Sequence, residues 1–366
     1  MKRFFLAALA IAAIASCAKN EVNEVTANDQ ITFQTVVGPA TKALIDGDVY
    51  ETSDPPFGTV AYYNANDPLT TFPNSAELYI PESKVSYSDS HWSTATPYYW
   101  PKNGSLTFFS YSPYDELEAT MTCDLTNGLT LTDWDVDTNP DVDVMVADVQ
   151  TGQTANDLNE GYTGVPTIFR HKLSQIVDVT FKTNYATSHD GTTGNEFIAG
   201  DKRFFINYVK INKLEQTGTY TSGIDVSNSQ LGTWELPTPA VYEHNYDWFI
   251  ETSSCNTEFK SAATSANNKM TYLLVMPQTY VTFTAPNTAA DVSNVEIKYT
   301  IRTYTDASNY SDDVVIAHVS MYDIFSTHAL AMNKKVTINF TIGLDQIYWA
   351  PSVEAWGNQT GAAEIN

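Results

Sequence analysis

The stretch Ile31-Thr32-Phe33-Gln34-Thr35-Val36-Val37 alternates apolar and polar residues over its first four positions and ends on two valines. Successive side chains of a β-strand point to opposite faces, so this spacing predicts a strand. One face of that strand carries Ile31, Phe33 and Val37. Gly38-Pro39-Ala40-Thr41 follows, which is typical of an extended segment rather than a helix.

A second stretch with the same period lies near the C-terminus. Residues Val336 to Ile342 alternate without interruption. The face they build is made of Val336, Ile338, Phe340 and Ile342. An apolar, aromatic segment, Ile347-Tyr348-Trp349, comes shortly afterwards. A terminal strand of this kind is either the last strand of a sheet or a strand that is lent to a neighbouring molecule.

Between these two stretches, short strand-like runs are separated by turn residues. They lie at 59–63, 106–111, 167–181, 204–211, 271–276, 295–304 and 313–320. Few segments show helical periodicity, so the pattern predicts an all-β protein built of sandwich domains. A chain of 366 residues is long enough for two domains. The segment from Gln150 to Gly164 is poor in apolar residues, and it predicts a boundary between domains at 43–160 and 161–366.

The N-terminus has the features of an export signal. Met1-Lys2-Arg3 is basic, Phe4 to Ile14 is apolar, and Cys17 follows two small residues. The apolar run is shorter than the roughly 20 residues that a transmembrane helix needs. The segment resembles a bacterial lipoprotein leader, which predicts removal of residues 1–16 and lipid on Cys17. Residues 17–42 then form a tether and a first strand, and Lys42 before Ala43 is a position that a trypsin-like protease could cut.

Composition excludes one large class of partners. The formal net charge is −24, with 19 Lys and Arg against 43 Asp and Glu. Affinity for nucleic acid comes from basic side chains that neutralise phosphates, so nucleic acid is not an expected partner. The same balance disfavours electrostatic docking on anionic lipid head groups.

No catalytic or cofactor motif is present in the sequence. The six His residues show no zinc-binding spacing, and there is no nucleophile elbow, phosphate-binding loop or CxxC pair. His171 is interpreted as a hydrogen-bonded structural residue. The alternating Asp residues at 133–143 lack the Gly and Glu of a calcium loop, and they are interpreted as a solvated strand face. We therefore expect no enzyme, metal or cofactor, and we expect Cys123 and Cys255 to be free thiols.

Aromatic residues gather between Trp92 and Tyr111. Asn103-Gly104 predicts a hairpin turn between Tyr98–Pro101 and Leu106–Tyr111. Trp92, Tyr98, Tyr99 and Trp100 could stack on sugar rings, although such a cluster is more often core packing. Two alternatives stay open at this point: a free-standing surface lipoprotein that binds glycans through these aromatics, and a β-sandwich glycoside hydrolase.

Several motifs together resemble one family, the fimbrillin-like subunits of the type V pili of Bacteroidia. They include the leader and early strand, Tyr99-Trp100-Pro101, Tyr111-Ser112-Pro113, Asp143-Val144-Met145-Val146-Ala147, Phe169-Arg170-His171-Lys172-Leu173-Ser174, Pro277-Gln278, Val353 and Trp356. The resemblance implies two tandem transthyretin-like β-sandwiches. It also implies an outer-membrane lipoprotein precursor that becomes part of a cell-surface fimbrium and serves adhesion.

The resemblance further implies how such subunits assemble. A surface protease cuts after the first strand, and a neighbouring subunit's C-terminal strand fills the groove that is left. Carried onto this chain, Cys17 is lipidated, Ile31 to Val37 is removable, Lys42 and Ala43 flank the cut, and residues 336–356 are the donor. The family's protease prefers Arg, whereas this chain offers Lys42, so an uncleaved pilus anchor is an alternative. The expected partners are other pilin subunits, the protease and a surface receptor.

Overall fold

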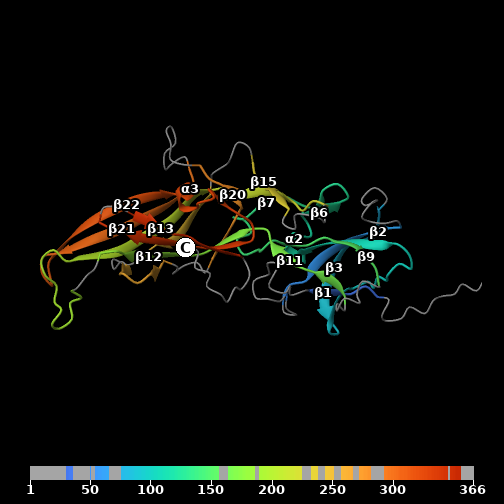
Figure 1. Ribbon diagram of the computed structural model, residues 1–366, viewed down its shortest axis with the longest axis horizontal. Coiled ribbons are helices and arrows are strands. Elements are labelled where there is room, and N and C mark those ends of the chain that lie inside the picture. The colour runs from blue at the N-terminus through green and yellow to red at the C-terminus, as the bar shows by residue number, and fades with distance from the viewer. Residues whose placement is uncertain are drawn as a thin grey trace, which may run out of the picture.

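The computed structural model describes residues 30–35, 50, 54–65, 76–155, 164–185, 189–224, 232–237, 244–250, 257–266, 272–281, 292–344 and 347–355. Strands dominate these residues, and the two described helices have four residues each: α2 (Tyr114–Leu117) and α3 (Met321–Ile324). The predicted all-β fold class is confirmed. The chain forms an elongated molecule in which the earlier strands occupy one half and the later strands the other (Figure 1).

The N-terminal half is built on a nine-stranded sheet. Its order is β10 (Val165–Thr167), β1 (Phe33–Thr35), β4 (His91–Thr94), β3 (Ala76–Ser88), β2 (Phe57–Asn64), β5 (Ser105–Ser112), β8 (Met145–Ala147) and β11 (Phe169–His171), with β9 (Gln150–Gln153) also pairing with β5. The two end strands, β10 and β11, are separated in the chain by Ile168 alone. The sheet therefore curls until its ends adjoin, and it encloses an aromatic-rich core.

A four-stranded sheet covers the other side of this half. Its order is β15 (Thr233–Glu235), β14 (Thr217–Thr221), β7 (Gly128–Asp135) and β6 (Met121–Asp124). A second core, which includes Tyr111, Leu131 and Tyr220, lies between the two sheets. Strands β14 and β15 come from beyond residue 160, and β14 nevertheless pairs with β7. The predicted boundary at 160/161 therefore does not divide the sheets, because β10, β11 and this hairpin complete the N-terminal half.

The C-terminal half is a sandwich of two sheets. One has the order β18 (Thr264–Ser265), β12 (Ser174–Thr183), β24 (Lys334–Ile342) and β25 (Ile347–Trp349), with β19 (Leu273–Val275) on β12 and β26 (Ser352–Ala355) on β24. The other has the order β16 (His244–Ile250), β13 (Lys202–Leu214), β21 (Asn294–Tyr304) and β22 (Tyr310–Ser320), with β17 (Thr257–Phe259) on β13. A large core with Phe181, Trp248 and Phe340 fills the space between them. The short strands β20 (Gln278–Thr279) and β23 (Ala329–Leu330) form a separate pair.

The hairpin predicted around Asn103-Gly104 is wrong. Gly104 does adopt a positive φ of 74°. However, Tyr99 forms a bridge with Gln30, and β5 pairs with β2, β8 and β9. Alternation of side chains identifies strands but does not specify their partners, and here the partners are distant in sequence.

Buried charges near the link between the two halves are paired. Arg170 donates from Nε and Nη2 to the Asp148 carboxylate at 2.6 and 2.8 Å. The Nδ1 atom of His171 lies 2.6 Å from an Asp143 carboxylate oxygen. His171 is buried and hydrogen-bonded, which agrees with its interpretation as a structural residue. In the acidic stretch, Asp135 accepts hydrogen bonds from the backbone N–H groups of Asp137 and Thr138, which makes a turn.

Candidate functional site

Strand β1 fills a narrow space in the curled sheet, between β4 on one side and β10 on the other. We call this space the β1 slot. Three residues of β1 pair in parallel with β10, in the register Phe33 to Val165, Gln34 to Pro166 and Thr35 to Thr167. On the β4 side only Phe33 is paired, opposite Trp92. The strand is therefore essential for continuity of the sheet, yet few backbone pairs hold it.

The residues just before β1 add further backbone contacts. The Ile31 N–H donates to the Tyr98 carbonyl at 2.8 Å, and the Val165 N–H donates to the Thr32 carbonyl at 2.8 Å. Backbone bonds of this kind bind any extended chain regardless of its side chains. The β1 slot can thus accept a different strand as far as its backbone is concerned.

Side chains supply the selectivity of the β1 slot. Ile31 and Phe33 are almost fully buried, at 1% and 3% exposed. The Phe33 ring packs edge-on against Phe57 and Phe108, with ring centroids 5.6 and 5.8 Å apart. Such edge-to-face geometry is the favoured arrangement of aromatic rings. The floor of the slot is therefore a rigid aromatic surface that takes large apolar side chains at alternate positions.

Tyr50 lies beside β1 but follows residue 42 in the chain. Its ring packs on Phe169 and Trp92, with centroids 4.8 and 5.5 Å away. Its hydroxyl lies 2.5 Å from the Ser112 hydroxyl, and its carbonyl accepts a hydrogen bond from Thr35 at 3.0 Å. Burial raises the pKa of Tyr50 far above its usual range, so the phenol stays neutral. Tyr50 therefore forms a wall of the slot that would remain after a cut at Lys42.

Gly164 brings the backbone of the neighbouring strand unusually close to β1. A Cβ atom at this position would lie 2.8 Å from the backbone carbon of Phe33 and 2.8 Å from the Thr32 carbonyl oxygen. Only glycine permits this approach without a shift of the backbone. The width of the β1 slot is consequently set by a residue that sequence reasoning had treated only as part of a loop.

The predicted donor residues of β24 occupy a different environment. Their alternation is confirmed, because one face of the strand is buried throughout, with Val336, Ile338, Phe340 and Ile342 at most 1% exposed. That face lies in the core of the strand's own domain, where the Phe340 ring stacks on Phe181 at 5.4 Å. Both edges of β24 are paired, with β12 on one side and with β25 and β26 on the other. Residues 336–342 are thus a core strand of their own domain in this structure, and their assignment as a donor stays a prediction.

The end of the described chain is held more loosely. Strands β25 and β26 pair only with β24 among the described residues. Val353 on β26 is 46% exposed. In the stretch Ile347 to Ala355, every second residue is apolar: Ile347, Trp349, Pro351, Val353 and Ala355. These nine residues lie at the edge of the sheet.

The comparisons with known proteins agree with this architecture. Residues 23–356 match the model of the family described as fimbrillin-like. The chain belongs to the fimbrillin-like family. This match confirms the resemblance inferred from the sequence motifs, and it identifies a structural rather than an enzymatic protein.

Solved structures show which fold this fimbrillin-like chain has. A fimbrial protein from Bacteroides vulgatus aligns with a TM-score of 0.61 and 18% identity, over 90% of this chain and all of the other. A putative cell adhesion protein from Parabacteroides distasonis aligns with a TM-score of 0.48 and 12% identity, over 91% and 98% of the two chains. The first similarity establishes a shared fold, while the second is too weak for an argument. No curated protein matches the chain.

The aromatic cluster of this fimbrillin-like chain is not a sugar-binding platform. Trp92 is 4% exposed and Trp100 is 8% exposed, and both belong to the core inside the curled sheet. Trp92 packs against Phe57 at a centroid distance of 5.4 Å, and Trp100 against Phe108 at 5.9 Å. Side chains that are enclosed in this way cannot stack on a glycan, so that alternative loses its site.

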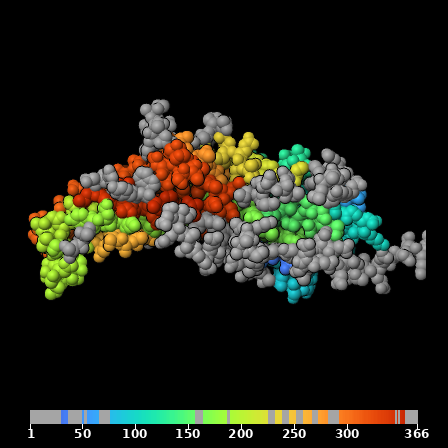
Figure 2. All heavy atoms as spheres, viewed as in Figure 1, coloured from blue at the N-terminus to red at the C-terminus, as the bar shows by residue number. Residues whose placement is uncertain are grey.

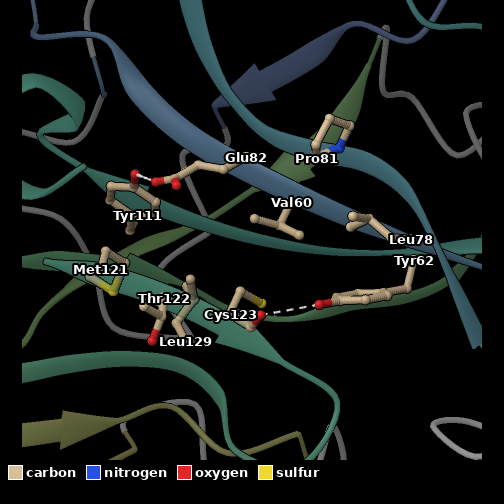
Figure 3. A pocket seen from close by; sticks show the side chains of 10 residues that line it. All are labelled: Val60, Tyr62, Leu78, Pro81, Glu82, Tyr111, Met121, Thr122, Cys123 and Leu129. Carbon is tan, nitrogen blue, oxygen red and sulfur yellow. Dashed lines mark hydrogen bonds between the residues drawn. The ribbon is translucent and has the colours of Figure 1, made fainter. Parts of the chain in front are cut away.

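A cavity of about 270 Å³ opens between the two sheets of the N-terminal half (Figure 3). Glu82 lies at one end of it and accepts a hydrogen bond from the Tyr111 hydroxyl, whereas Tyr62 donates to the Cys123 carbonyl at 3.2 Å. Cys123 is a free cysteine. Burial raises the pKa of its thiol to about 12, and a protonated thiol is a poor nucleophile. Cys123 is therefore not an activated nucleophile in this cavity.

Several predicted functional residues lie outside the described part of the chain: Cys17, Val37, Lys42, Ala43 and Cys255. Among the residues that are described, no group of three or more His, Cys, Asp or Glu side chains could hold a metal ion. Within the same residues, no helix has the length and apolar character that crossing a membrane requires.

Proposed function

We propose that this fimbrillin-like chain is a subunit of a cell-surface fimbria that serves adhesion and assembles by strand exchange. The single observation that carries the proposal is the β1 slot. A three-residue strand closes a nine-stranded sheet, covers a preformed aromatic floor, and lies upstream of Lys42 in the sequence. Removing that strand would expose a groove whose best occupant is another apolar strand.

The occupant that we propose is the terminal segment Ile347 to Ala355 of a neighbouring subunit. Its apolar residues recur with a period of two, as the floor of the β1 slot requires. It lies at the edge of its own sheet, so its departure leaves β24 and the core around Phe340 intact. The proposed donor is thereby narrowed from residues 336–356 to residues 347–355.

Export and processing complete the proposal. The leader and Cys17 are consistent with lipid anchoring in the outer membrane as a precursor, and cleavage after Lys42 would release the first strand and the lipid together. The resulting partners are other pilin subunits and a trypsin-like protease. If Lys42 is not cut, the same chain keeps its lipid and serves as the anchor of the fimbria. N-terminal analysis of surface-displayed protein separates the two, since a start at Cys17 means anchor and a start at Ala43 means processed subunit.

The assembly experiment uses the mature chain with and without a trypsin-like protease. We expect polymers on size-exclusion chromatography only after cleavage. A chain that ends at residue 346 retains β24 and should be cleaved without forming polymers. Polymers that form equally well from this truncated chain would overturn the donor assignment. Polymers that form without cleavage would overturn the role of β1.

A further inference from the structure

The basic residues of this acidic chain are not spread evenly. Strands β13 and β21 contain six of the 19 Lys and Arg residues and one acidic residue, Glu296. By contrast, residues 76–155 of the N-terminal half contain 13 Asp and Glu against two Lys. Strands β13 and β21 are therefore locally basic, whereas residues 76–155 are locally acidic and the whole chain is strongly negative.

Three of these six basic residues, Lys210, Lys298 and Arg302, belong to one group on the protein surface. On the side of β13 and β21 that points away from the core, cations alternate with aromatic rings. We call the following six residues the basic face: Phe205, Tyr208, Lys210, Lys298, Arg302 and Tyr310. They lie on three adjacent strands, β13, β21 and β22, at the left of Figure 1.

Ring contacts hold the cations of the basic face in place. Arg302 lies over the Tyr310 ring at 3.7 Å and over the Phe205 ring at 5.0 Å. Lys210 and Lys298 lie over the Tyr208 ring at 5.1 and 5.7 Å. Such contacts orient the cationic side chains on the surface of the sheet.

The carboxylates nearby neutralise this face only in part. Asp312 binds Arg302 through two hydrogen bonds of 2.8 and 2.9 Å. Asp247 lies 3.8 Å from Lys210, a long and exposed contact, and Glu296 accepts a hydrogen bond from Tyr208. Within the described residues, no carboxylate lies at ion-pair distance from Lys298. Lys210 and Lys298 thus remain the positive centre of the face.

The edge of the same sheet adds apolar surface. Strand β22 pairs with β21 along its full length and is the end strand of its sheet. Val314 and Ile316 on it are 57% and 54% exposed, and Tyr310 is 51% exposed. A face that combines positive charge, rings and exposed aliphatic residues has the composition of a protein interface.

We infer that the basic face docks on the acidic N-terminal half of a second copy of this chain. The inference rests on the proposed function in one respect, namely that copies of this chain lie side by side in a fimbria. Charge complementarity selects the occupant, because two like-charged subunits repel each other unless the positive face of one meets the acidic half of the other. This contact lies outside the β1 slot and does not require strand exchange.

The test uses uncleaved mature protein, in which β1 is in place, so that its outcome is independent of strand exchange. Lys210→Glu with Lys298→Glu reverses the basic face. The matched control, Lys182→Glu with Lys260→Glu, makes the same change in net charge at two exposed lysines outside both the basic face and residues 76–155. Light scattering gives the second virial coefficient of each variant, and circular dichroism confirms that both fold. At about 10 mM salt, where the Debye length is about 30 Å, we expect a more positive coefficient for the face variant than for the control.

At about 1 M salt the Debye length falls to about 3 Å, and the two variants should coincide. Equal coefficients at low salt would overturn the inference, because net charge alone would then explain the repulsion. Carbodiimide coupling of a mixture of isotopically light and heavy wild-type protein locates the contact. We expect links between copies that join Lys210 or Lys298 to carboxylates in residues 76–155. The inference would also be overturned if the cross-links between copies used only lysines other than Lys210 and Lys298.

An acidic glycan is the competing occupant, and polygalacturonate is the probe for it. The face would be assigned to a glycan instead if two results are found together. Polygalacturonate would bind the wild-type protein but not the face variant, and the virial coefficients of the face variant and the control would be equal. The two proposals can fail separately. If the cleaved protein does not polymerise but the uncleaved copies still make this contact, the proposed function is overturned and this inference stands.

Discussion

Strands β1 and β24 look alike in side-chain pattern and differ in how they are held. Both alternate apolar with polar residues, and both bury their apolar face almost completely. However, β24 pairs with β12 at nine positions, whereas β1 pairs with β10 at three positions and with β4 at one. Burial alone therefore does not separate the strand that we propose is removed from the strand that we propose stays in place. The two strands differ in the number of backbone pairs that hold them.

The free energy gained by burying apolar side chains also differs between β1 and β24. Burial of a large apolar side chain contributes about 1.5–3 kcal/mol, so Ile31 and Phe33 contribute roughly 3–6 kcal/mol and the four core residues of β24 roughly 6–12 kcal/mol. Another strand with similar side chains could replace the smaller contribution in full. Loss of the larger one would exceed or match the whole stability of a typical domain.

The largest expected effect comes from a substitution in β24. Phe340→Ala should lower the free energy of unfolding of the C-terminal half by about 3–5 kcal/mol, because a ring stacked on Phe181 is removed from a closed core. Urea denaturation followed by hydrogen exchange of each half measures this loss. Phe33→Ala is the matched variant and should leave the C-terminal half unchanged. A loss below about 1 kcal/mol for Phe340→Ala would end the distinction between the two strands.

A smaller effect is expected where β1 meets its neighbour. Gly164→Ala places a methyl group 2.8 Å from the Phe33 backbone, and overpacking of this kind typically costs about 1–3 kcal/mol. We expect faster hydrogen exchange of the amides from Ile31 to Thr35, with no change in β24. Unchanged protection of those amides would show that β10 moves instead of β1.

Alkaline pH should distinguish the two halves. Lys172 is fully buried beside the N-terminal core, and burial lowers its pKa to about 7 from an unfolded value near 10.4. Between these values the unfolded chain binds the extra proton, so stability of the N-terminal half should rise with pH above 7, by at most about 1.4 kcal/mol per pH unit. Urea denaturation at pH 7, 8 and 9 tests this rise. Lys172→Met should abolish the slope, and a slope that persists in this variant would contradict the assignment.

The smallest effect on stability is expected at the chain end. Val353→Asp changes a half-exposed residue on β26, so the free energy of unfolding should stay within about 0.5 kcal/mol of the original. Polymer formation after cleavage should nevertheless be lost, since a carboxylate would enter an aromatic groove. Size-exclusion chromatography and urea denaturation of the same preparation measure both. Normal polymers from this variant would exclude β26 as the donor.

The sequence predicted the strands of this protein better than their partners. Period-two alternation located β1, β2, β5, β13, β21, β22 and β24, and the family resemblance inferred from scattered motifs is confirmed. The hairpin at Gly104 was wrong because it assumed that neighbours in sequence pair in space. The same sheet topology shows β14 pairing with β7 across more than 80 residues, which a boundary placed at residue 160 does not anticipate.

By itself the sequence determined that the chain is all-β, acidic and fimbrillin-like, because alternation, composition and motif order are local properties. Only the tertiary structure showed how each buried strand is held, and our proposal about which strand is replaced rests on that difference. Phe33 and Phe340 are equally apolar and sit in equally regular stretches. One closes a slot beside Gly164 near the start of the chain, and the other lies inside a sheet that is paired on both edges. That difference depends on contacts between distant segments, which no local pattern records.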